Sequence, residues 1–309
     1  MRAIHIRGRG GPAQLVYGEA PKPALAAGDA LVRVCATGIT PAELSWAETY
    51  QNADGSGRIP SIPGHEVSGV VEALAPGVSD LRVGDEVYGL TDFARDGAAA
   101  EYVAVRARNL APKPRTMDHA HAAAVPLSAL TAWQALFDHG GLAEGQRVLI
   151  HGAAGGVGTF AVQLARWRRA QVIATAAQRD FEFLRQIGTD VVIDFATERF
   201  EDKIHDVDVV LDTIGGSTLE RSWGVVKPGG TLVTLVAPVS AGSGARHGVN
   251  AVFFIVQPSR TELSEITRLI DEHAVQAIVA DVVPLIQARD AFERGLKGHV
   301  RGKLVLQVA

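Results

Sequence analysis

The sequence contains a single cysteine, Cys35, among its 309 residues. One cysteine excludes an internal disulfide and any zinc site that is built from several cysteines. The residues before it alternate in the manner of a β-strand, so we expect Cys35 to be a small buried hydrophobic residue rather than a catalytic thiol.

Long apolar runs and an excess of charge of one sign are also missing. No apolar run approaches the roughly 20 residues that span a bilayer, and the cationic first 12 residues lack the apolar core of a secretion signal. The formal net charge is −4 and no basic stripe is present, so we expect no binding to nucleic acid or to a membrane. Cytoplasmic residence is the resulting prediction.

Glycine is abundant, with 33 residues that gather at turns in the first third of the chain and between residues 152 and 158. Up to about residue 115, short β-rich runs are separated by turn residues, which predicts a partly open β-barrel. Pro112 and Pro114 end this region, because proline suits neither helix nor sheet. The expected strands include 30–36, 66–73, 86–90 and 101–105.

Beyond this point strands and helices alternate, which is typical of a parallel sheet covered by helices on both faces. The strands are expected at 148–150, 172–174, 191–193, 209–211, 231–235 and, at the sheet edge, 251–256. The helices are expected at 118–124, 130–139, 156–168, 180–187, 217–224 and 262–272. A late strand, 302–307, indicates that the C-terminus rejoins the first domain. We therefore predict one domain from 1–127 with 261–309, and a second from 128–260.

The most informative stretch runs from Val148 to Arg166, where a buried strand leads through a glycine-rich loop into an amphipathic helix. Glycine lets the backbone approach a pyrophosphate, and the helix N-terminus offers unpaired N–H groups to the anion. Ala153 stands where the usual GxGxxG motif has its first glycine. The stretch predicts a dinucleotide-binding loop, with a tight turn that binds no ligand as the alternative. Its predicted cofactor-binding residues are Gly152, Ala154, Gly155, Gly156, Val157 and Gly158.

The end of the next strand predicts which dinucleotide is bound. NAD-binding folds carry an acidic residue about 20 positions after the glycines, where it binds the ribose hydroxyls. Here the strand passes through Thr175 without an acid, and Gln178 and Arg179 follow. This favours the 2′-phosphate of NADPH and predicts Thr175, Gln178 and Arg179 as cofactor-binding residues, while Asp180 is expected to be a helix N-cap. A solvated Arg179 is the alternative, and Lys303 would then be the next basic residue to test.

These features resemble the medium-chain dehydrogenase/reductase superfamily, in particular its zinc-independent quinone oxidoreductase branch. The resemblance covers essentially the whole chain and is carried by residues 62–71, 83–87, 130–133, 151–158 and 301–306. It implies a GroES-like β-barrel domain and a Rossmann domain with a doubly wound parallel sheet, with the active site in the cleft between them.

The resemblance also implies that catalytic zinc is lost. Zinc-dependent relatives bind the metal through two cysteines and a histidine, and the matching positions are Thr40, Leu127 and His65. One imidazole does not hold zinc. We therefore predict no metal, and we expect His65 to be a hydrogen-bonded structural residue.

Without a metal, hydride transfer suits a substrate that delocalises its developing negative charge. We predict an NADPH-dependent reductase of small quinones or α,β-unsaturated carbonyl compounds. An enoyl-thioester reductase and a non-catalytic NADPH-binding protein are the alternatives.

The resemblance implies that Thr40 and Thr131 lie near the nicotinamide, and Tyr50 is a candidate donor of a proton or hydrogen bond. A helix-start hydroxyl is the alternative for Thr131, and packing is the alternative for Tyr50. We also predict a homodimer, because the apolar edge strand at 251–256 would be liable to aggregate if it were left open.

Overall fold

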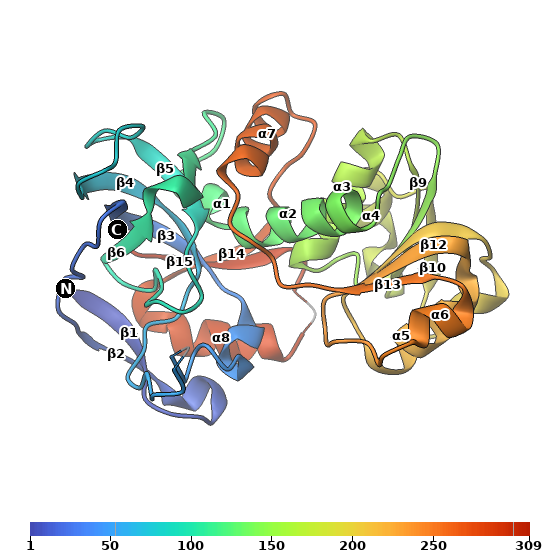
Figure 1. The fold of residues 1–309 in the computed structure, drawn as a ribbon, viewed down its shortest axis with the longest axis horizontal. Helices are drawn as coiled ribbons and strands as arrows, with labels where there is room; N and C mark the ends of the chain where they lie inside the picture. Colours follow the sequence, from blue (N-terminus) through green and yellow to red (C-terminus); the bar gives the residue numbers. More distant parts are fainter. Residues whose placement is uncertain (53, 299) are drawn as a thin grey trace. The chain divides into compact units, whose positions relative to one another are not determined.

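The computed structural model describes residues 1–52, 54–298 and 300–309, which form two units (Figure 1). Unit 1 consists of Met1–Leu127, Pro258–His273 and Ala277–Ala309, and unit 2 of Ser128–Gln257 and Ala274–Gln276. The observed divisions fall after residues 127 and 257, and residues 274–276 belong to unit 2, whereas the sequence analysis placed 261–309 in the first domain.

The described part of unit 1 contains a seven-stranded sheet and a separate hairpin. Strands β14, β15, β3, β4, β5 and β7 lie in that order, and β6 also pairs with β3. The sheet strands are β3 (Asp29–Gly38), β4 (Glu66–Leu74), β5 (Glu86–Leu90), β6 (Tyr102–Arg106), β7 (Leu110–Pro112), β14 (Val279–Pro284) and β15 (Lys303–Gln307), and the hairpin is β1 (Arg2–Ile6) with β2 (Leu15–Glu19). The helices are α1 (His119–Ala123), α7 (Arg260–Asp271) and α8 (Ala288–Leu296).

One face of β3 belongs to the core of this unit. Val32 and Val34 are fully buried in it. Successive side chains of a strand point to opposite faces, so Arg33 and Cys35 point to the other side, which is only partly covered. The expectation of a buried Cys35 is therefore wrong, since its side chain is half-buried.

Unit 2 contains a six-stranded parallel sheet in the order β10-β9-β8-β11-β12-β13 among the described residues. Its strands are β8 (Arg147–His151), β9 (Gln171–Ala176), β10 (Val191–Asp194), β11 (Val207–Asp212), β12 (Val226–Thr234) and β13 (Asn250–Phe253). Its helices are α3 (Gly156–Trp167), α4 (Phe181–Gln186), α5 (Gly216–Ser222) and α6 (Ser243–His247), together with most of α2 (Pro126–Trp133).

The strand order of unit 2 reverses between β8 and β11. The chain moves from β8 to β9 and β10 in one direction, and from β11 to β12 and β13 in the other. Because crossovers between parallel strands are right-handed, α3 and α4 lie on one face of the sheet and α5 and α6 on the other (Figure 1). Such a reversal is where open α/β sheets bind ligands, at the carboxyl ends of the strands.

Several elements differ from the expected ones. The helix expected at 130–139 is the end of α2 followed by a π-helical turn at Gln134–His139. The edge strand β13 ends at Phe253 rather than at residue 256. The β1–β2 hairpin and the helix α8 are additional elements that the sequence analysis did not predict.

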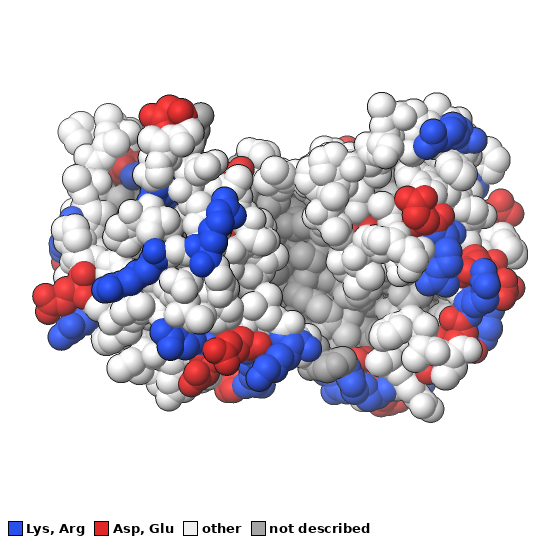
Figure 2. Space-filling model, turned by 90° about the horizontal axis from the view of Figure 1, so that it is seen from below, with Lys and Arg blue, Asp and Glu red and all other residues white. Residues whose placement is uncertain are grey.

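The surface carries charges of both signs. On the face drawn in Figure 2, lysine and arginine side chains are interspersed with aspartate and glutamate on each unit. No helix in the described part of the chain is long and apolar enough to cross a membrane.

Candidate functional site

The glycine-rich loop of unit 2 lies at the carboxyl end of β8, where the strand order reverses. Gly152 has φ +73°, and a Cβ there would lie 2.2 Å from Thr213 Oγ1. A Cβ at Gly158 would lie 2.2 Å from the carbonyl oxygen of Gly152. Gly152 therefore permits the left-handed turn, and Gly158 permits the close packing of α3 on the loop.

The first turn of α3 leaves its N–H groups without a side-chain cap. Gly155 is the N-cap and has no side chain that could accept a hydrogen bond from the turn. Ala154, Gly155, Gly156 and Val157 are all partly exposed. An exposed helix N-terminus without a cap is a site for a phosphate, so these residues fit the pyrophosphate of a dinucleotide.

His151, the last residue of β8, connects neighbouring elements below this loop by hydrogen bonds, a role that the sequence analysis missed. It is fully buried, and burial lowers its pKa from 6.5 to about 4, so the ring is neutral. Its Nε2 lies 3.0 Å from Ser222 Oγ, and its Nδ1 lies 2.9 Å from Thr175 Oγ1. Ser222 donates its only hydroxyl hydrogen to Thr218 O and therefore accepts from Nε2–H. Nδ1 consequently accepts from Thr175, whose oxygen retains only acceptor capacity for a ligand.

Asp212 holds the neighbouring loop in place and is a second residue that the sequence analysis missed. Its buried carboxylate accepts hydrogen bonds from Gly215 N at 2.9 Å, Ile214 N at 3.0 Å and Thr234 Oγ1 at 2.8 Å. The Ile214 side chain then lies 3.2 Å from where a Cβ of Gly152 would be. An acidic residue directly after the apolar run 209–211 was the available signal.

The residues after β9 lie on the surface of unit 2. Gln178 and Arg179 are exposed, in the 3₁₀ turn Gln178–Asp180. Arg179 Nε lies 3.7 Å from Asp180 Oδ2, and the Arg179 side chain is 54% exposed. Asp180 is the N-cap residue of α4, as predicted. An exposed guanidinium at this position is compatible with a 2′-phosphate, and its role stays a prediction.

Thr131 lies in α2, whose first residue is Pro126, and its side chain is buried. It is thus an interior residue of the helix, and the alternative of a helix-start hydroxyl is wrong. Its role near a nicotinamide stays a prediction.

Thr40 follows β3 in unit 1 and is the N-cap residue of the 3₁₀ turn Pro41–Ser45. Its side chain is half-buried, and its Oγ1 accepts a hydrogen bond from Lys303 Nζ at 3.0 Å. Lys303 itself is buried and belongs to unit 1.

Tyr50 lies in the hydrophobic core of unit 1 and is 6% exposed. Its hydroxyl donates a hydrogen bond to Leu44 O at 2.6 Å, and the Arg9 guanidinium carbon lies 4.2 Å from the centre of its ring. Burial raises the pKa of the phenol. Since the hydroxyl hydrogen already has an acceptor, the geometry favours the packing role.

His65 is hydrogen-bonded, as predicted. Its Nδ1 lies 2.9 Å from Thr91 Oγ1 and its Nε2 lies 3.8 Å from Glu43 Oε2. Burial lowers its pKa to about 3, so the ring is neutral. The rings of Trp46 and Phe93 pack around it. In the described part of the chain, no three His, Cys, Asp or Glu side chains form a group that could hold a metal ion.

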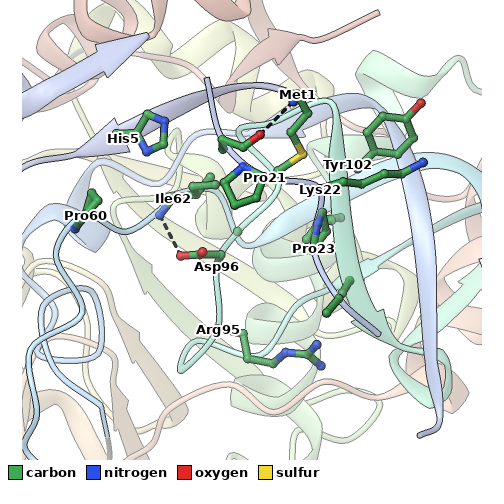
Figure 3. Close-up of a pocket in the computed structure, with 15 residues that line it drawn as sticks. Met1, His5, Pro21, Lys22, Pro23, Pro60, Ile62, Arg95, Asp96 and Tyr102 are labelled. Atoms are coloured by element: carbon green, nitrogen blue, oxygen red, sulfur yellow. Dashed lines mark hydrogen bonds between the residues drawn. The ribbon is translucent and has the colours of Figure 1, made fainter. Parts of the chain in front are cut away.

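A separate pocket of about 740 Å³ opens on unit 1, and none of the predicted site residues lines it (Figure 3). Several of its polar groups are already partnered within the protein. The N-terminal amine donates to Ala20 O at 2.8 Å, Asp96 accepts from Ile62 N at 3.0 Å, and the Lys22 amine lies 3.9 Å from the centre of the Tyr102 ring. We assign no ligand to this pocket.

Comparison with known proteins identifies the family. Residues 26–115 match the alcohol dehydrogenase GroES-like domain, and residues 187–306 match the domain described as zinc-binding dehydrogenase. A protein of Arthroderma benhamiae named "Probable zinc-binding oxidoreductase, mitochondrial" is 34% identical over 305 residues, which cover 93% of this chain and 91% of that protein. The chain belongs to the medium-chain dehydrogenase/reductase superfamily. The expected GroES-like domain and Rossmann domain are thereby confirmed.

Two further relatives indicate the branch of the superfamily. A quinone oxidoreductase from Coxiella burnetii superposes with a TM-score of 0.91 at 30% identity, covering 100% of this chain and 99% of that one. An NADPH-dependent alkenal/one oxidoreductase of Arabidopsis thaliana, a chloroplastic protein, is 32% identical over 89% of this chain and 71% of its own length. The chain is thus an NAD(P)H oxidoreductase, and its zinc-free status stays a prediction. Because the relatives include mitochondrial and chloroplastic proteins, cytoplasmic residence stays a prediction.

Proposed function

We propose that this protein is an NADPH-dependent reductase of quinones or α,β-unsaturated carbonyl compounds and that it works without zinc. The observation that carries the proposal is the carboxyl end of the sheet in unit 2. There an uncapped helix N-terminus fits a pyrophosphate, and an exposed arginine, Arg179, follows a strand that ends without an acid. The named activities of the quinone and alkenal reductases support the choice of substrate.

Each candidate residue has a distinct role in this proposal. The backbone N–H groups of residues 154–157 hold the pyrophosphate, and Gln178 and Arg179 hold the 2′-phosphate. Thr175 accepts a hydrogen bond from the adenosine half, and Thr131 contacts the nicotinamide half. The Thr40 hydroxyl donates a hydrogen bond to the substrate oxygen, where negative charge develops. When bound, the reduced nicotinamide supplies a hydride with two electrons, and a proton from water completes the reduction.

The zinc-free mechanism rests on the three positions at which zinc-dependent relatives bind the metal. Leu127 has no donor atom in its side chain, and the Thr40 oxygen accepts from the Lys303 ammonium, a cation that opposes a metal ion. Only the His65 imidazole remains, and its Nδ1 is bonded to Thr91. Elemental analysis should give far less than one zinc per chain. About one zinc per chain, with activity lost on chelation, would contradict this part of the proposal.

The substrate class is tested by following NADPH oxidation with a small quinone, an enone and an enoyl thioester, each against a blank without enzyme. We expect turnover of the quinone or the enone. Preference for the thioester would identify an enoyl-thioester reductase instead. NADPH binding without turnover of any of the three would indicate a non-catalytic NADPH-binding protein.

We also propose that the protein forms a homodimer in the cytoplasm and binds neither nucleic acid nor membranes. The mixed charges on the face in Figure 2 support the absence of a nucleic-acid partner. Retention on heparin at physiological salt would contradict that expectation.

A further inference from the structure

Three strands of unit 1 bring a buried ion pair to the half-buried hydroxyl of Thr40. Glu66 begins β4, Lys303 begins β15, and both strands pair with β3 close to Gly38. The Lys303 Nζ lies 2.5 Å from Glu66 Oε2 and donates to Thr40 Oγ1 at 3.0 Å. The Lys303 and Glu66 side chains are 6% and 1% exposed. We call these three residues the Thr40–Lys303–Glu66 chain.

The burial of this ion pair requires a glycine beside the carboxylate. A Cβ at Gly38 would lie 2.5 Å from Glu66 Oε2, so only glycine fits beside the carboxylate. The other carboxylate oxygen, Oε1, accepts a hydrogen bond from Leu127 N at 3.0 Å. A buried ion pair is often no more stabilising than apolar residues of the same volume. Stability therefore does not by itself account for the pair.

The chain fixes the direction of the Thr40 hydroxyl. An ammonium group only donates hydrogen bonds, so the Thr40 oxygen is the acceptor and its hydrogen points away from Lys303. Among the residues that the structure describes, no acceptor takes that hydrogen. A hydroxyl that accepts from a cation is polarised and becomes a stronger donor. Thr40 thus presents an oriented, activated O–H at a partly exposed position.

We propose that Lys303 is a positioning residue that holds the Thr40 hydroxyl as a donor toward the substrate carbonyl oxygen, and that Glu66 holds Lys303. This inference rests on the proposed function, in which Thr40 meets the substrate. As the hydride arrives, the substrate oxygen gains negative charge, and a donor that is already oriented stabilises that charge without reorganisation. Lys303 acts through Thr40 and not by touching the substrate.

The test is a double-mutant cycle measured by steady-state turnover of a quinone or an enone, with NADPH affinity measured separately by fluorescence. Lys303→Met and Thr40→Val should each lower kcat roughly 10- to 100-fold, at or below the ~10²–10³-fold cost of losing one oxyanion donor. NADPH affinity should change less than about twofold. The double variant should be no slower than the slower single variant, because both changes remove one function. Lys303→Arg, which retains the charge, should recover most of the loss.

Lys303→Met leaves the Glu66 carboxylate buried without its partner and risks misfolding. The combined variant Lys303→Met with Glu66→Gln removes both charges and should melt close to the wild type while keeping the low kcat. Losses that multiply in the double variant, or a wild-type kcat in the charge-neutral variant, would overturn the inference and leave the proposed function standing. Wild-type protein that reduces neither substrate overturns both.

Discussion

At the scale of single residues, Arg179 accounts for the cofactor preference that we propose. A charge-assisted hydrogen bond contributes about 1.5–3 kcal/mol, and each 1.4 kcal/mol is about tenfold. Since the side chain is half exposed and lies beside Asp180, we expect the lower part of that range. NADPH should be preferred over NADH by about ten- to fortyfold in kcat/KM, at the lower end of a ten- to hundredfold range.

Arg179→Ala should erase most of this preference by weakening NADPH, while NADH is used nearly as before. Steady-state kinetics with both cofactors measures the effect. Arg185, an exposed arginine on α4, is the matched control, and Arg185→Ala should leave the preference intact. Equal use of NADH and NADPH by the wild type, or an undiminished preference in Arg179→Ala, would show that the assignment of Arg179 is wrong.

Tyr50 is expected to affect stability and not turnover. Tyr50→Phe removes a buried hydrogen bond to Leu44 O, so the free energy of unfolding should fall by about 1 kcal/mol. Denaturant unfolding measures this change, with Tyr17→Phe at an exposed tyrosine as the control. We expect kcat within about twofold of the wild type. A kcat that falls by ~10²-fold or more would restore the role of proton donor.

Glu43 should make stability fall as the pH rises from about 4.5 to about 8. Its carboxyl is 1% exposed, accepts one hydrogen bond from Gly64 N, and has its pKa raised to about 8 by burial. In the unfolded chain the carboxyl is ionised above its ordinary pKa of 4.5. Between these values the folded protein holds one more proton than the unfolded chain, so this contribution is complete below pH 4.5 and is lost by about pH 8.

The effect is measured by urea unfolding between pH 6.5 and 8, where the histidines His65 and His151, with pKa values lowered to about 3 and 4, are neutral in the folded protein. Relative to Glu43→Gln, the wild type should lose about 1 kcal/mol per pH unit over this range. Glu48→Gln, at an exposed position of the same segment, should change the slope little. A wild-type slope equal to that of Glu43→Gln would mean that the carboxyl is already ionised at neutral pH.

At the scale of elements, what could be predicted from sequence depended on local pattern. The central strands of unit 2, β8, β9, β11 and β12, are largely buried on both faces and appear as apolar runs between helices, and their ends were predicted to within five residues. The edge strand β14 alternates half-buried and exposed residues, which gives no continuous apolar run. The glycine loop was predicted because its residues are adjacent in the chain.

The polar contacts of the site could not be predicted, because their partners are far apart in the chain. His151 and Ser222 are separated by 71 residues, and Thr40 and Lys303 by 263. No local pattern indicates that such residues meet. Such contacts can be inferred only when it is known which strands pair and on which face of the sheet each side chain lies.

The connection between β8 and α3 gives a prediction at this scale. A Cβ at Gly158 would lie 2.2 Å from Gly152 O and 2.6 Å from Ala153 Cα, and backbone atoms cannot move aside singly. Gly158→Ala should therefore lower the free energy of unfolding by about 1–3 kcal/mol and weaken NADPH binding. Gly155→Ala is the matched control for stability, because its Cβ would lie 3.3 Å from Gly152 O at φ −80°. A Gly158→Ala variant that melts at the wild-type temperature would show that the loop and α3 leave space for a methyl group at this position.

At the scale of the whole molecule, the open edge of the sheet in unit 2 bears on assembly. Within the described residues, β13 pairs with β12 on one side and with no strand on the other. Ala251, Val252 and Phe253 on this strand are half-buried, and Ile255 just beyond it is 55% exposed. An apolar edge of this kind is a template for pairing with another strand. A second copy related by a two-fold axis is the proposed occupant, because such symmetry closes the assembly at two chains.

Light scattering at micromolar concentration should therefore give twice the chain mass of 32.6 kDa. Val252→Glu places like charges at the proposed two-fold contact, where they repel each other, and should yield a monomer. Val282→Glu is the matched control, since Val282 lies on β14, the edge strand of the other sheet, and is 37% exposed. The control should remain a dimer. A monomeric wild type would exclude the dimer at that concentration. A dimer that survives Val252→Glu but is dissociated by Val282→Glu would show that the interface lies at β14 and not at β13.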